Sequence, residues 1–510
     1  MCKNSFKVMA FASLLGLTAA ASFTSCSDNE TPAPSPTDNR HWSTDGGLKA
    51  ADNLLFDGNQ IGNGDKEFVF TGKQTLKKGT YLLKGWVYIA NGAELTIEPG
   101  TVIKGDKQTM AALITERGGK LFAQGTKDAP IVFTSEEAKG QRKPGDWGGL
   151  ILCGRAPHNA GEAQIEGGPR TKHGGSNPHD NSGVLSYVRV EFAGFPFATD
   201  QEINGVTLGS IGDSTRIDHV QVSYSNDDSY EWFGGTVNCK HLIAYNGWDD
   251  DFDTDNGFSG HVQYGLSIRD PRIADKSQSN GFESDNDASG STATPVTSAI
   301  FSNMTFIGPK QGDEQFLNTA DYITGGSMNP LNGSGLGKYQ AAMQIRRGSR
   351  LNCINSIALG WPIGLIIDSE KGDTREQARQ GNIRLQNIWF ANMDATGSDA
   401  NKEYRDVRVD YVNKKAVVDE SQKSWSSTFF LAQPGNKVST PAEMLLTGRN
   451  LFTGLKVDFM PAVGSPLLNA ASFNDVNSTW FDKVNYIGAF SSTDNWLSGW
   501  TNFDPENTDY

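Results

Sequence analysis

The chain has 510 residues, of which 57 are glycine and 20% are charged. A long, glycine-rich chain of this kind favours a turn-rich β protein over a helical one. The formal net charge of −14 argues against charge-driven binding of nucleic acid or anionic lipid, and it suits binding of divalent cations.

The N-terminus predicts an export signal followed by a tether. Residues 1–25 are a predicted lipoprotein signal peptide, because a basic end carrying Lys3 and Lys7 precedes an apolar stretch too short to span a membrane. The small residues ahead of Cys26 resemble a bacterial lipobox and predict lipidation of Cys26 by acyl chains such as palmitate. Simple signal-peptidase cleavage is the alternative. Residues 26–45, with three prolines, are predicted to be a flexible tether.

The acidic residues directly after Cys26 resemble a targeting signal. Ser27–Asp28–Asn29–Glu30 resembles the tag that sends Bacteroidota lipoproteins to the outer face of the cell outer membrane. The resemblance implies a lipid-anchored protein that faces outside the cell.

The body of the chain is predicted to be a solenoid. Residues 237–248 and 351–361 are two copies of one apolar pattern, and weaker copies occur between and around them. Two successive intervals are 22 and 24 residues long, and the longer intervals indicate coils that carry loop insertions. This spacing fits one coil of a right-handed parallel β-helix, so we predict an all-β fold with a β-helix at 46–395 and loop insertions. A β-sandwich is the alternative, but its hairpin turns are scarce. Residues 396–510 are predicted to be a β-rich tail that caps the open end.

The histidines divide into two groups. His158, His173, His179 and Asp180 share a Gly-rich excursion at 143–182, where zinc binding competes with an ordinary surface loop. His219, His241 and His261 recur at coil-like spacing and are predicted to form a ladder on one face. Cys153, Cys239 and Cys353 are predicted to be buried free thiols.

Three acidic runs between residues 226 and 287 recur at the length of one coil. Stacked coils would bring their carboxylates together, which is unfavourable unless a cation lies among them. Asp251, Asp253 and Asp255 alternate and should share one side of a strand. Asp228 precedes Asp251 by 23 residues and Glu231 precedes Asp253 by 22, so we expect each pair to be neighbours on successive coils. The predicted ligands for Ca²⁺ are Asp227, Asp228, Glu231, Asp250, Asp251, Asp253, Asp255, Glu283, Asp285 and Asp287. The alternative is that some of these residues only shape turns.

Aromatic and basic residues beside the acidic runs suggest further roles. Tyr230, Trp232, Phe258 and Phe282 are candidates for stacking on sugar rings, with inward-facing ladders as the alternative. A Ca²⁺-dependent lyase would need a basic side chain, for which Arg269 and Arg272 are the candidates. Salt bridging to nearby acids is the alternative for both arginines.

Asp146–Trp147–Gly148–Gly149, the acidic runs and the aromatic tail together resemble a family of β-helix lipoproteins from Bacteroidota with a pectate-lyase-like fold. The resemblance implies fold and location but no activity. We therefore expect a calcium-stabilised surface lipoprotein that binds an extracellular ligand, with glycan as the favoured class, for nutrient capture or adhesion. A polysaccharide lyase or glycoside hydrolase, and an accessory partner of an outer-membrane transporter, are the alternatives.

Overall fold

The computed structural model describes residues 50–198, 201–399, 407–410, 415–418, 423–446 and 457–510. The predicted signal peptide, the tether and Cys26 lie outside these residues. Among the helices described, none combines the length and the apolar character that crossing a membrane requires.

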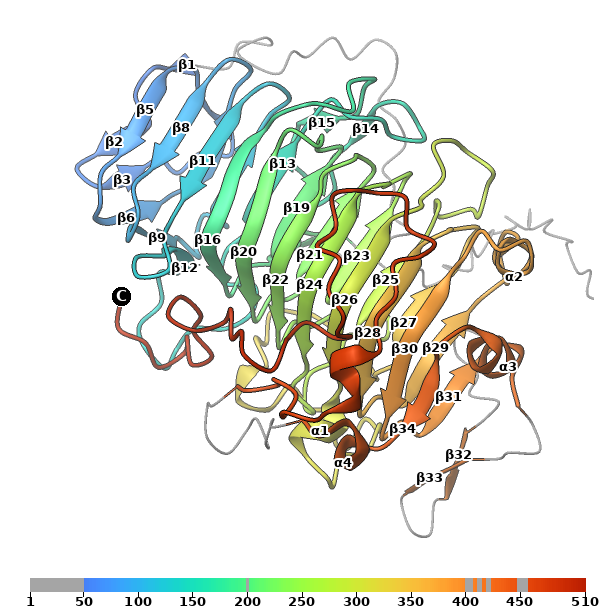
Figure 1. Cartoon of the computed structure of the whole chain (residues 1–510). Coiled ribbons are helices and arrows are strands. Elements are labelled where there is room, and N and C mark those ends of the chain that lie inside the picture. The colour runs from blue at the N-terminus through green and yellow to red at the C-terminus, as the bar shows by residue number, and fades with distance from the viewer. Residues whose placement is uncertain (1–49, 199–200, 400–406, 411–414, 419–422, 447–456) are drawn as a thin grey trace, which may run out of the picture.

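One wall of the molecule is a parallel sheet to which each coil contributes a short strand (Figure 1). Its strands, in spatial order, are β1 (Ala50–Ala51), β4 (Phe68–Phe70), β7 (Trp86–Ile89), β10 (Ala112–Thr115), β13 (Gly149–Cys153), β19 (Val206–Gly209), β21 (Tyr230–Phe233), β23 (Phe252–Asp255) and β25 (Phe282–Ser284). A shorter parallel sheet follows along the chain, with β27 (Ala341–Ile345), β29 (Ile363–Ile367) and β31 (Ala395–Ser398). We call these strands the front wall.

The other sheet, which we call the long sheet, runs through nearly every coil. In spatial order it contains β2 (Leu55–Asp57), β3 (Gln60–Ile61), β6 (Thr80–Leu83), β9 (Val102–Gly105), β12 (Ile131–Ser135), β16 (Gly183–Glu191), β20 (Arg216–Ser223), β22 (Cys239–Tyr245), β24 (His261–Ile268), β26 (Ile300–Ile307), β28 (Asn352–Leu359), β30 (Leu385–Ala391) and β34 (Lys437–Ser439). β5 (Lys73–Leu76), β8 (Glu94–Ile97) and β11 (Lys120–Gln124) join it beside β16. The two walls confirm the predicted right-handed parallel β-helix.

A column of left-handed residues makes a corner in the long sheet. In the early coils the corner separates two strands: β11 pairs with the first half of β16 and β12 with its second half. Between those halves, and at the matching place in later strands, one residue has φ between 50° and 65°. The members of the column are Tyr187, His219, His241, Tyr264, Asn303, Asn355 and Asn387. Such angles are rare for residues with side chains, so this repeat bends every coil at one place.

The predicted histidine ladder is confirmed for two of its three members. The rings of His219 and His241 stack with centroids 4.3 Å apart, and Tyr187 stacks on the other face of His219. The next rung is Tyr264, not His261, because the register matches His241 with Tyr264. His261 lies three residues earlier and stacks on Trp480.

The predicted excursion at 143–182 is interrupted by a strand. β13 belongs to the front wall, and only the residues after it leave the coil, where β14 (Ala163–Gln164) and β15 (Lys172–His173) form a hairpin. A second hairpin joins β17 (Pro196–Ala198) to β18 (Gln201–Glu202). The thiols of Cys153, Cys239 and Cys353 are free and buried, as predicted.

The C-terminal region differs from the predicted β-rich cap at 396–510. The walls continue past residue 395, since β31 and β34 each pair with a preceding coil. The cap is α3 (Trp425–Ala432), which packs on β29 and β31 and stacks Phe430 on Phe390 at 4.1 Å. The other short elements are α1 (Pro309–Gly312), η2 (Gly326–Met328), α2 (Thr374–Arg379), β32 (Val407–Asp410), β33 (Lys415–Val418), α4 (Pro441–Met444) and η5 (Pro466–Asn469).

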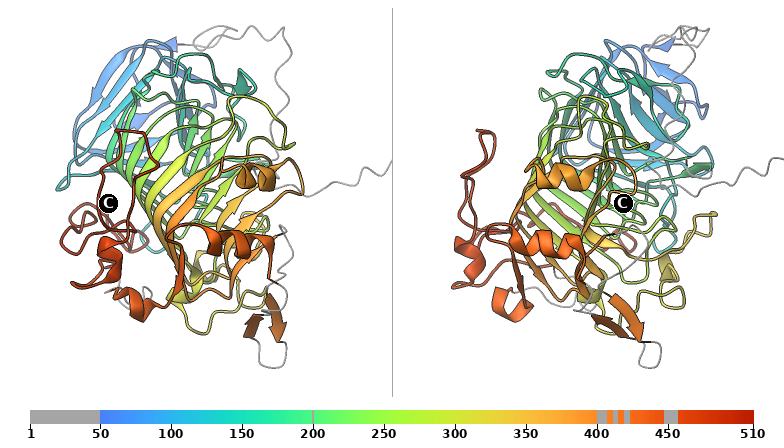
Figure 2. Two further views of the ribbon diagram at one scale, coloured as in Figure 1. Left: turned by 45° about the vertical axis from the view of Figure 1, so that its right-hand side comes forward. Right: turned by 90° about the vertical axis from the view of Figure 1, so that its right-hand side faces the viewer.

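Residues 457–510, which we call the C-terminal strap, cross the outside of the long sheet toward the early coils (Figures 1 and 2). The strap is mostly irregular, and it packs its tryptophans on the corner column. Trp496 and Trp500 contact the rings of His219, His241 and Tyr187. At the far end, Lys104 Nζ donates to the main-chain oxygen of Tyr510 at 2.8 Å.

Candidate metal centre

The acidic side chains converge on the outer face of the front wall. Glu231 on β21, Asp253 on β23 and Glu283 on β25 are register partners, so their side chains stack on successive coils. Their neighbours Tyr230, Phe252 and Phe282 point inward, because side chains alternate along a strand. This confirms the predicted one-coil offset between Glu231 and Asp253.

The turns that lead into β21 and β23 supply the remaining acids. Asp227 and Asp249, and likewise Asp228 and Asp250, are 22 positions apart, the same offset that pairs Glu231 with Asp253. The main-chain N–H of Asp250 donates to Asp228 Oδ1 at 2.8 Å. Asp228 therefore lies beside Asp250, whereas the sequence argument placed it beside Asp251.

Seven carboxylates form what we call the acidic cluster. It contains three overlapping groups, in each of which one oxygen per residue lies within 4.8 Å of the others. The groups are Asp227, Asp228 and Asp249; Asp228, Glu231 and Asp253; and Asp250, Asp253 and Glu283. Because Asp228 and Asp253 each belong to two groups, the three groups are continuous.

Three oxygens at the centre of the acidic cluster have no hydrogen-bond partner within the described part of the chain. Asp228 and Asp253 are each 2% exposed and Glu231 is 0% exposed. Asp228 Oδ2, Glu231 Oε1 and Asp253 Oδ1 are buried and accept no hydrogen bond from any described residue. Buried carboxylate oxygens are normally satisfied, so these three call for a ligand or a proton.

Burial and mutual repulsion act on the acidic cluster together. Burial first, and then Asp227, Asp253 and Glu231, raise the pKa of Asp228 well above its ordinary range. Burial, followed by neighbouring acids, does the same to the pKa values of Glu231, Asp250 and Asp253. The cluster is therefore poorly stabilised as a set of bare anions.

Loops from distant parts of the chain cover the acidic cluster. Asn280 donates from its main chain to Asp250, and Asn226 donates to Ser334 Oγ at 2.6 Å. Glu166, from the loop after β13, lies close enough to Glu231 to raise its pKa.

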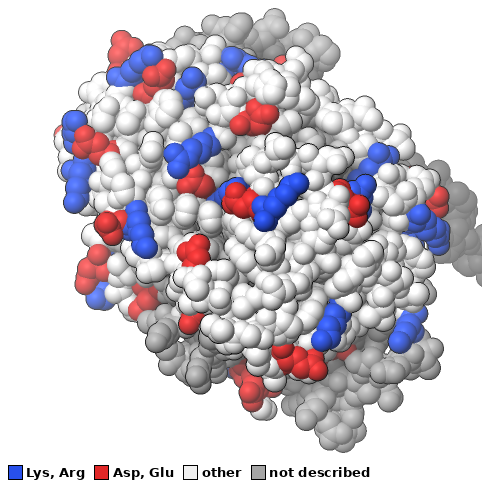
Figure 3. Space-filling view, viewed as in Figure 1, with Lys and Arg blue, Asp and Glu red and all other residues white. Residues whose placement is uncertain are grey.

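Surface charges of both signs are scattered in small groups over the face in Figure 3. The concentration of acid is a feature of the interior and not of that surface.

Four predicted ligands lie outside the three groups. The carboxylate of Asp251 accepts bonds from Arg269 and Ser267, and Asp285 pairs with Arg346 and Arg347 at 2.8 and 2.9 Å. Asp255 accepts a bond from the main-chain N–H of Asn256. For Asp287 the turn-forming alternative holds, since its carboxylate binds Ser289 and Ser291. Conversely, the prediction omitted Asp249, although its offset from Asp227 was available in the sequence.

The prediction that four aromatic rings bind ligand is wrong. Tyr230, Trp232, Phe258 and Phe282 are all fully buried in the main hydrophobic core. Trp232 stacks on Phe258 with ring centroids 5.4 Å apart. Large rings stabilise a coil best when they fill its interior, so the inward-ladder alternative holds for all four.

Neither predicted arginine is placed to act as a base. Arg269 is fully buried and contacts Asp251 at 2.7 Å. Burial alone would lower the pKa of its guanidinium, but Asp251 outweighs this and raises it. Arg272 is exposed and lies over the ring of Tyr322 at 4.0 Å. The salt-bridge alternative is confirmed for Arg269, whereas Arg272 makes a cation–π contact instead.

The histidines of the excursion do not converge as a zinc site would. His158 and His173 have ring centroids 5.0 Å apart, but His173 Nδ1 contacts Ser210. His179 is exposed and pairs with Asp213. Burial lowers the pKa of His158 to about 4, so its ring is neutral. Asp180 is buried near the coil and belongs to no candidate metal group among the described residues.

Comparison with known proteins yields one family. Residues 69–430 match the family model described as the pectate-lyase like beta helix domain. No curated protein and no solved structure matches the chain. The match covers most of the chain and coincides with the two parallel walls and the cap. The chain therefore belongs to the pectate-lyase-like β-helix family.

Proposed function

We propose that this protein is an extracellular β-helix that binds Ca²⁺ at its acidic cluster and needs the ion for stability. The observation that carries the proposal is the set of three buried, unpartnered oxygens on Asp228, Glu231 and Asp253. These three residues also form one of the groups in which one carboxylate oxygen per residue lies within 4.8 Å of the others, and this spacing suits a single bridging cation.

The electrostatic cost of the bare cluster supports this proposal. Two charges ~4.8 Å apart repel by about 3 kcal/mol at an effective dielectric constant of ~20. A divalent cation turns that repulsion into attraction, whereas protonation only removes it.

The chemistry of the ligands favours calcium. Ca²⁺ takes six to eight oxygen ligands in flexible geometry, and the acidic cluster offers carboxylates from three coils. The amide oxygen of Asn204 is also buried and unpartnered, and its nitrogen contacts Glu231, so a neutral oxygen lies near. Mg²⁺ prefers to keep several waters, which an enclosed cluster of this kind disfavours.

Thermal unfolding in chelator and in calcium tests the proposal. At a free Ca²⁺ concentration 100-fold above Kd, binding adds about 2.7 kcal/mol of stability, which for a chain of this length raises Tm by about 3 °C. The matched control is Glu231→Gln, which keeps the side-chain shape and removes one ligand charge. Equal Tm values in EGTA and in calcium for the wild-type chain would reject the site.

We further propose that the protein is lipidated at Cys26 and displayed on the outside of the outer membrane. The supporting observation is the lipobox-like sequence with the acidic tag after it. Incorporation of an alkyne-labelled palmitate, and its loss in Cys26→Ala, tests the anchor. Protease accessibility on whole cells tests the outward orientation.

The ligand that we propose for this displayed protein is a glycan, captured for nutrition or adhesion. The support is membership of a β-helix family named for a polysaccharide-active fold, together with the predicted surface location. Retardation in gels that contain polysaccharide tests binding. Co-purification with an outer-membrane transporter from cells would instead identify the protein as a transporter accessory.

A polysaccharide lyase is the second candidate, because buried arginines adjoin the acidic cluster. Arg346 contacts both Glu283 and Asp285. Appearance of ultraviolet-absorbing unsaturated products from acidic polysaccharides, abolished by EGTA, would favour the lyase. Binding without such products would favour capture.

A further inference from the structure

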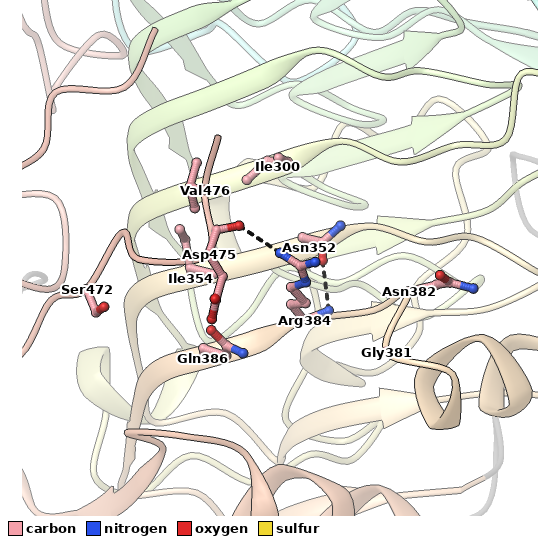
Figure 4. A pocket seen from close by; sticks show the side chains of 10 residues that line it. All are labelled: Ile300, Asn352, Ile354, Gly381, Asn382, Arg384, Gln386, Ser472, Asp475 and Val476. Atoms are coloured by element: carbon pink, nitrogen blue, oxygen red, sulfur yellow. Dashed lines mark hydrogen bonds between the residues drawn. The ribbon is translucent and has the colours of Figure 1, made fainter. Parts of the chain in front are cut away.

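A polar cavity lies between the long sheet and the C-terminal strap, on a different wall from the acidic cluster (Figure 4). Its volume is about 280 Å³. The outward-facing residues of three successive coils form its floor, because the register aligns Ile300 with Asn352 and Ile354 with Gln386. Arg384 continues the first of these rows, since its main-chain N–H donates to Asn352 Oδ1 at 2.8 Å.

The strap completes the wall of this cavity and is fixed there. Arg384 Nη1 donates to the main-chain oxygen of Asp475 at 2.7 Å, as Figure 4 shows. Ile354, which belongs to the floor, also packs with Phe473 and Phe481 of the strap in a small hydrophobic cluster. The cavity is therefore preformed by the fold.

Polar groups that line the cavity retain hydrogen-bonding capacity. Arg384 and Asp475 are exposed and Gln386 is half-buried. Arg384 uses Nη1 to reach the main-chain oxygen of Asp475, and among the described residues none hydrogen-bonds to the side-chain amide of Gln386 or to the carboxylate of Asp475. These groups offer donors and acceptors in one small space. Ile300, Ile354 and Val476 provide an apolar surface beside them.

The charges and the size of the cavity restrict the ligand. One guanidinium and one carboxylate line it, so their formal charges cancel and a neutral ligand is favoured. Pockets for drug-sized ligands span ~300–1,000 Å³, so this one suits a single small ring. A pyranose has hydroxyl groups around its rim and apolar C–H groups on its faces, which matches both kinds of lining.

We propose that this cavity binds one neutral sugar residue, with hydroxyl groups bound by Arg384, Gln386 and Asp475. This inference rests on the proposed glycan capture and assigns it to the seam between coil and strap. It replaces the four aromatic rings of the core as the candidate ligand site.

Saturation-transfer NMR tests the site with the full chain and three probes: the methyl glycosides of glucose, galactose and mannose. We expect transfer from the protein to at least one glycoside, reduced at least fivefold in Gln386→Ala and in Asp475→Ala. The matched control is Asp494→Ala, which removes an exposed carboxylate elsewhere on the same strap. It should leave the transfer unchanged.

The outcomes separate this site from glycan binding in general. Equal transfer in wild type and in both cavity variants would overturn the site while leaving glycan binding intact. Absence of transfer to all three glycosides would also overturn it, and polysaccharide gel retardation then decides separately whether the chain binds glycan. Unchanged thermal unfolding of the variants shows that loss of transfer is not loss of fold.

Discussion

Two neighbouring sets of buried acids on this β-helix differ in whether the described chain supplies a positively charged partner. Asp251 and Asp285 are fully buried, and each contacts an arginine. Asp228, Glu231 and Asp253 are equally buried, but each has an oxygen with no described protein partner. Burial is thus common to both sets, and the source of positive charge distinguishes them. The first set is neutralised by the protein itself, and the second needs something from outside.

The largest expected effect is at the arginine-neutralised set. Arg269→Met removes the partner of a buried charge and should destabilise the chain by about 3–5 kcal/mol in urea unfolding. Calcium should not restore the loss, because Asp251 lies outside the three metal groups. The double variant with Asp251→Asn should recover most of the stability. A loss below about 1 kcal/mol in the single variant would contradict the comparison.

The second prediction concerns the pH dependence of stability that follows from the burial of His158. Burial lowers the pKa of His158 from 6.5 to about 4, so the folded state binds fewer protons than the unfolded state between these values. Its contribution is fully present above pH ~6.5 and is lost as the pH falls toward ~4, amounting to about 3 kcal/mol. Urea unfolding across this range should show a shallower slope in His158→Gln. His179→Gln, which changes an exposed ring, is the control.

Matched glutamate substitutions give effects of opposite sign. In EGTA, Glu231→Gln should stabilise the chain by about 2 kcal/mol, because it removes repulsion within the cluster. Glu283→Gln should destabilise it, because Glu283 contacts Arg346. Thermal unfolding of both variants measures the difference. Destabilisation by Glu231→Gln in EGTA would show that the bare cluster is not repulsive.

The smallest effect is expected at an exposed pair on the early coils. Lys73 and Glu94 are register partners on β5 and β8, and their charged atoms are 2.9 Å apart. Lys73→Ala should change the free energy of unfolding by less than about 0.5 kcal/mol, because solvent screens this pair. A larger loss of unfolding free energy in urea would mean that burial does not distinguish strongly stabilising ion pairs from weakly stabilising ones.

The sequence was sufficient to predict the solenoid but not the direction of every side chain. The 22-residue offset identified the stack of Glu231 on Asp253, since register follows directly from coil length. Asp251 lies just before β23, so the alternation of side chains along a strand does not determine where its carboxylate points. The carboxylate instead faces Arg269, with which it forms an ion pair. The inward position of Trp232 was one of two open alternatives, and neighbouring aromatic residues did not decide between them.

Other features depend on contacts between distant segments. The strap contacts Lys104 through Tyr510, 406 positions later in the sequence, and His219 through Trp500, 281 positions later. No local sequence pattern predicts such a contact. The same reasoning explains why Arg384 and Asp475 were not singled out. Each is an ordinary surface residue until the strap brings them together.

The strap also sets an order of events during biogenesis. Coils that emerge early from the ribosome must wait for residues 457–510 before the outer side of His219 and His241 is covered. Until then, the surface that Trp496 and Trp500 cover is available to chaperones or to other unfinished chains. The last residues synthesised of those described are therefore needed to complete the packing of coils that were synthesised about 250 residues or more earlier.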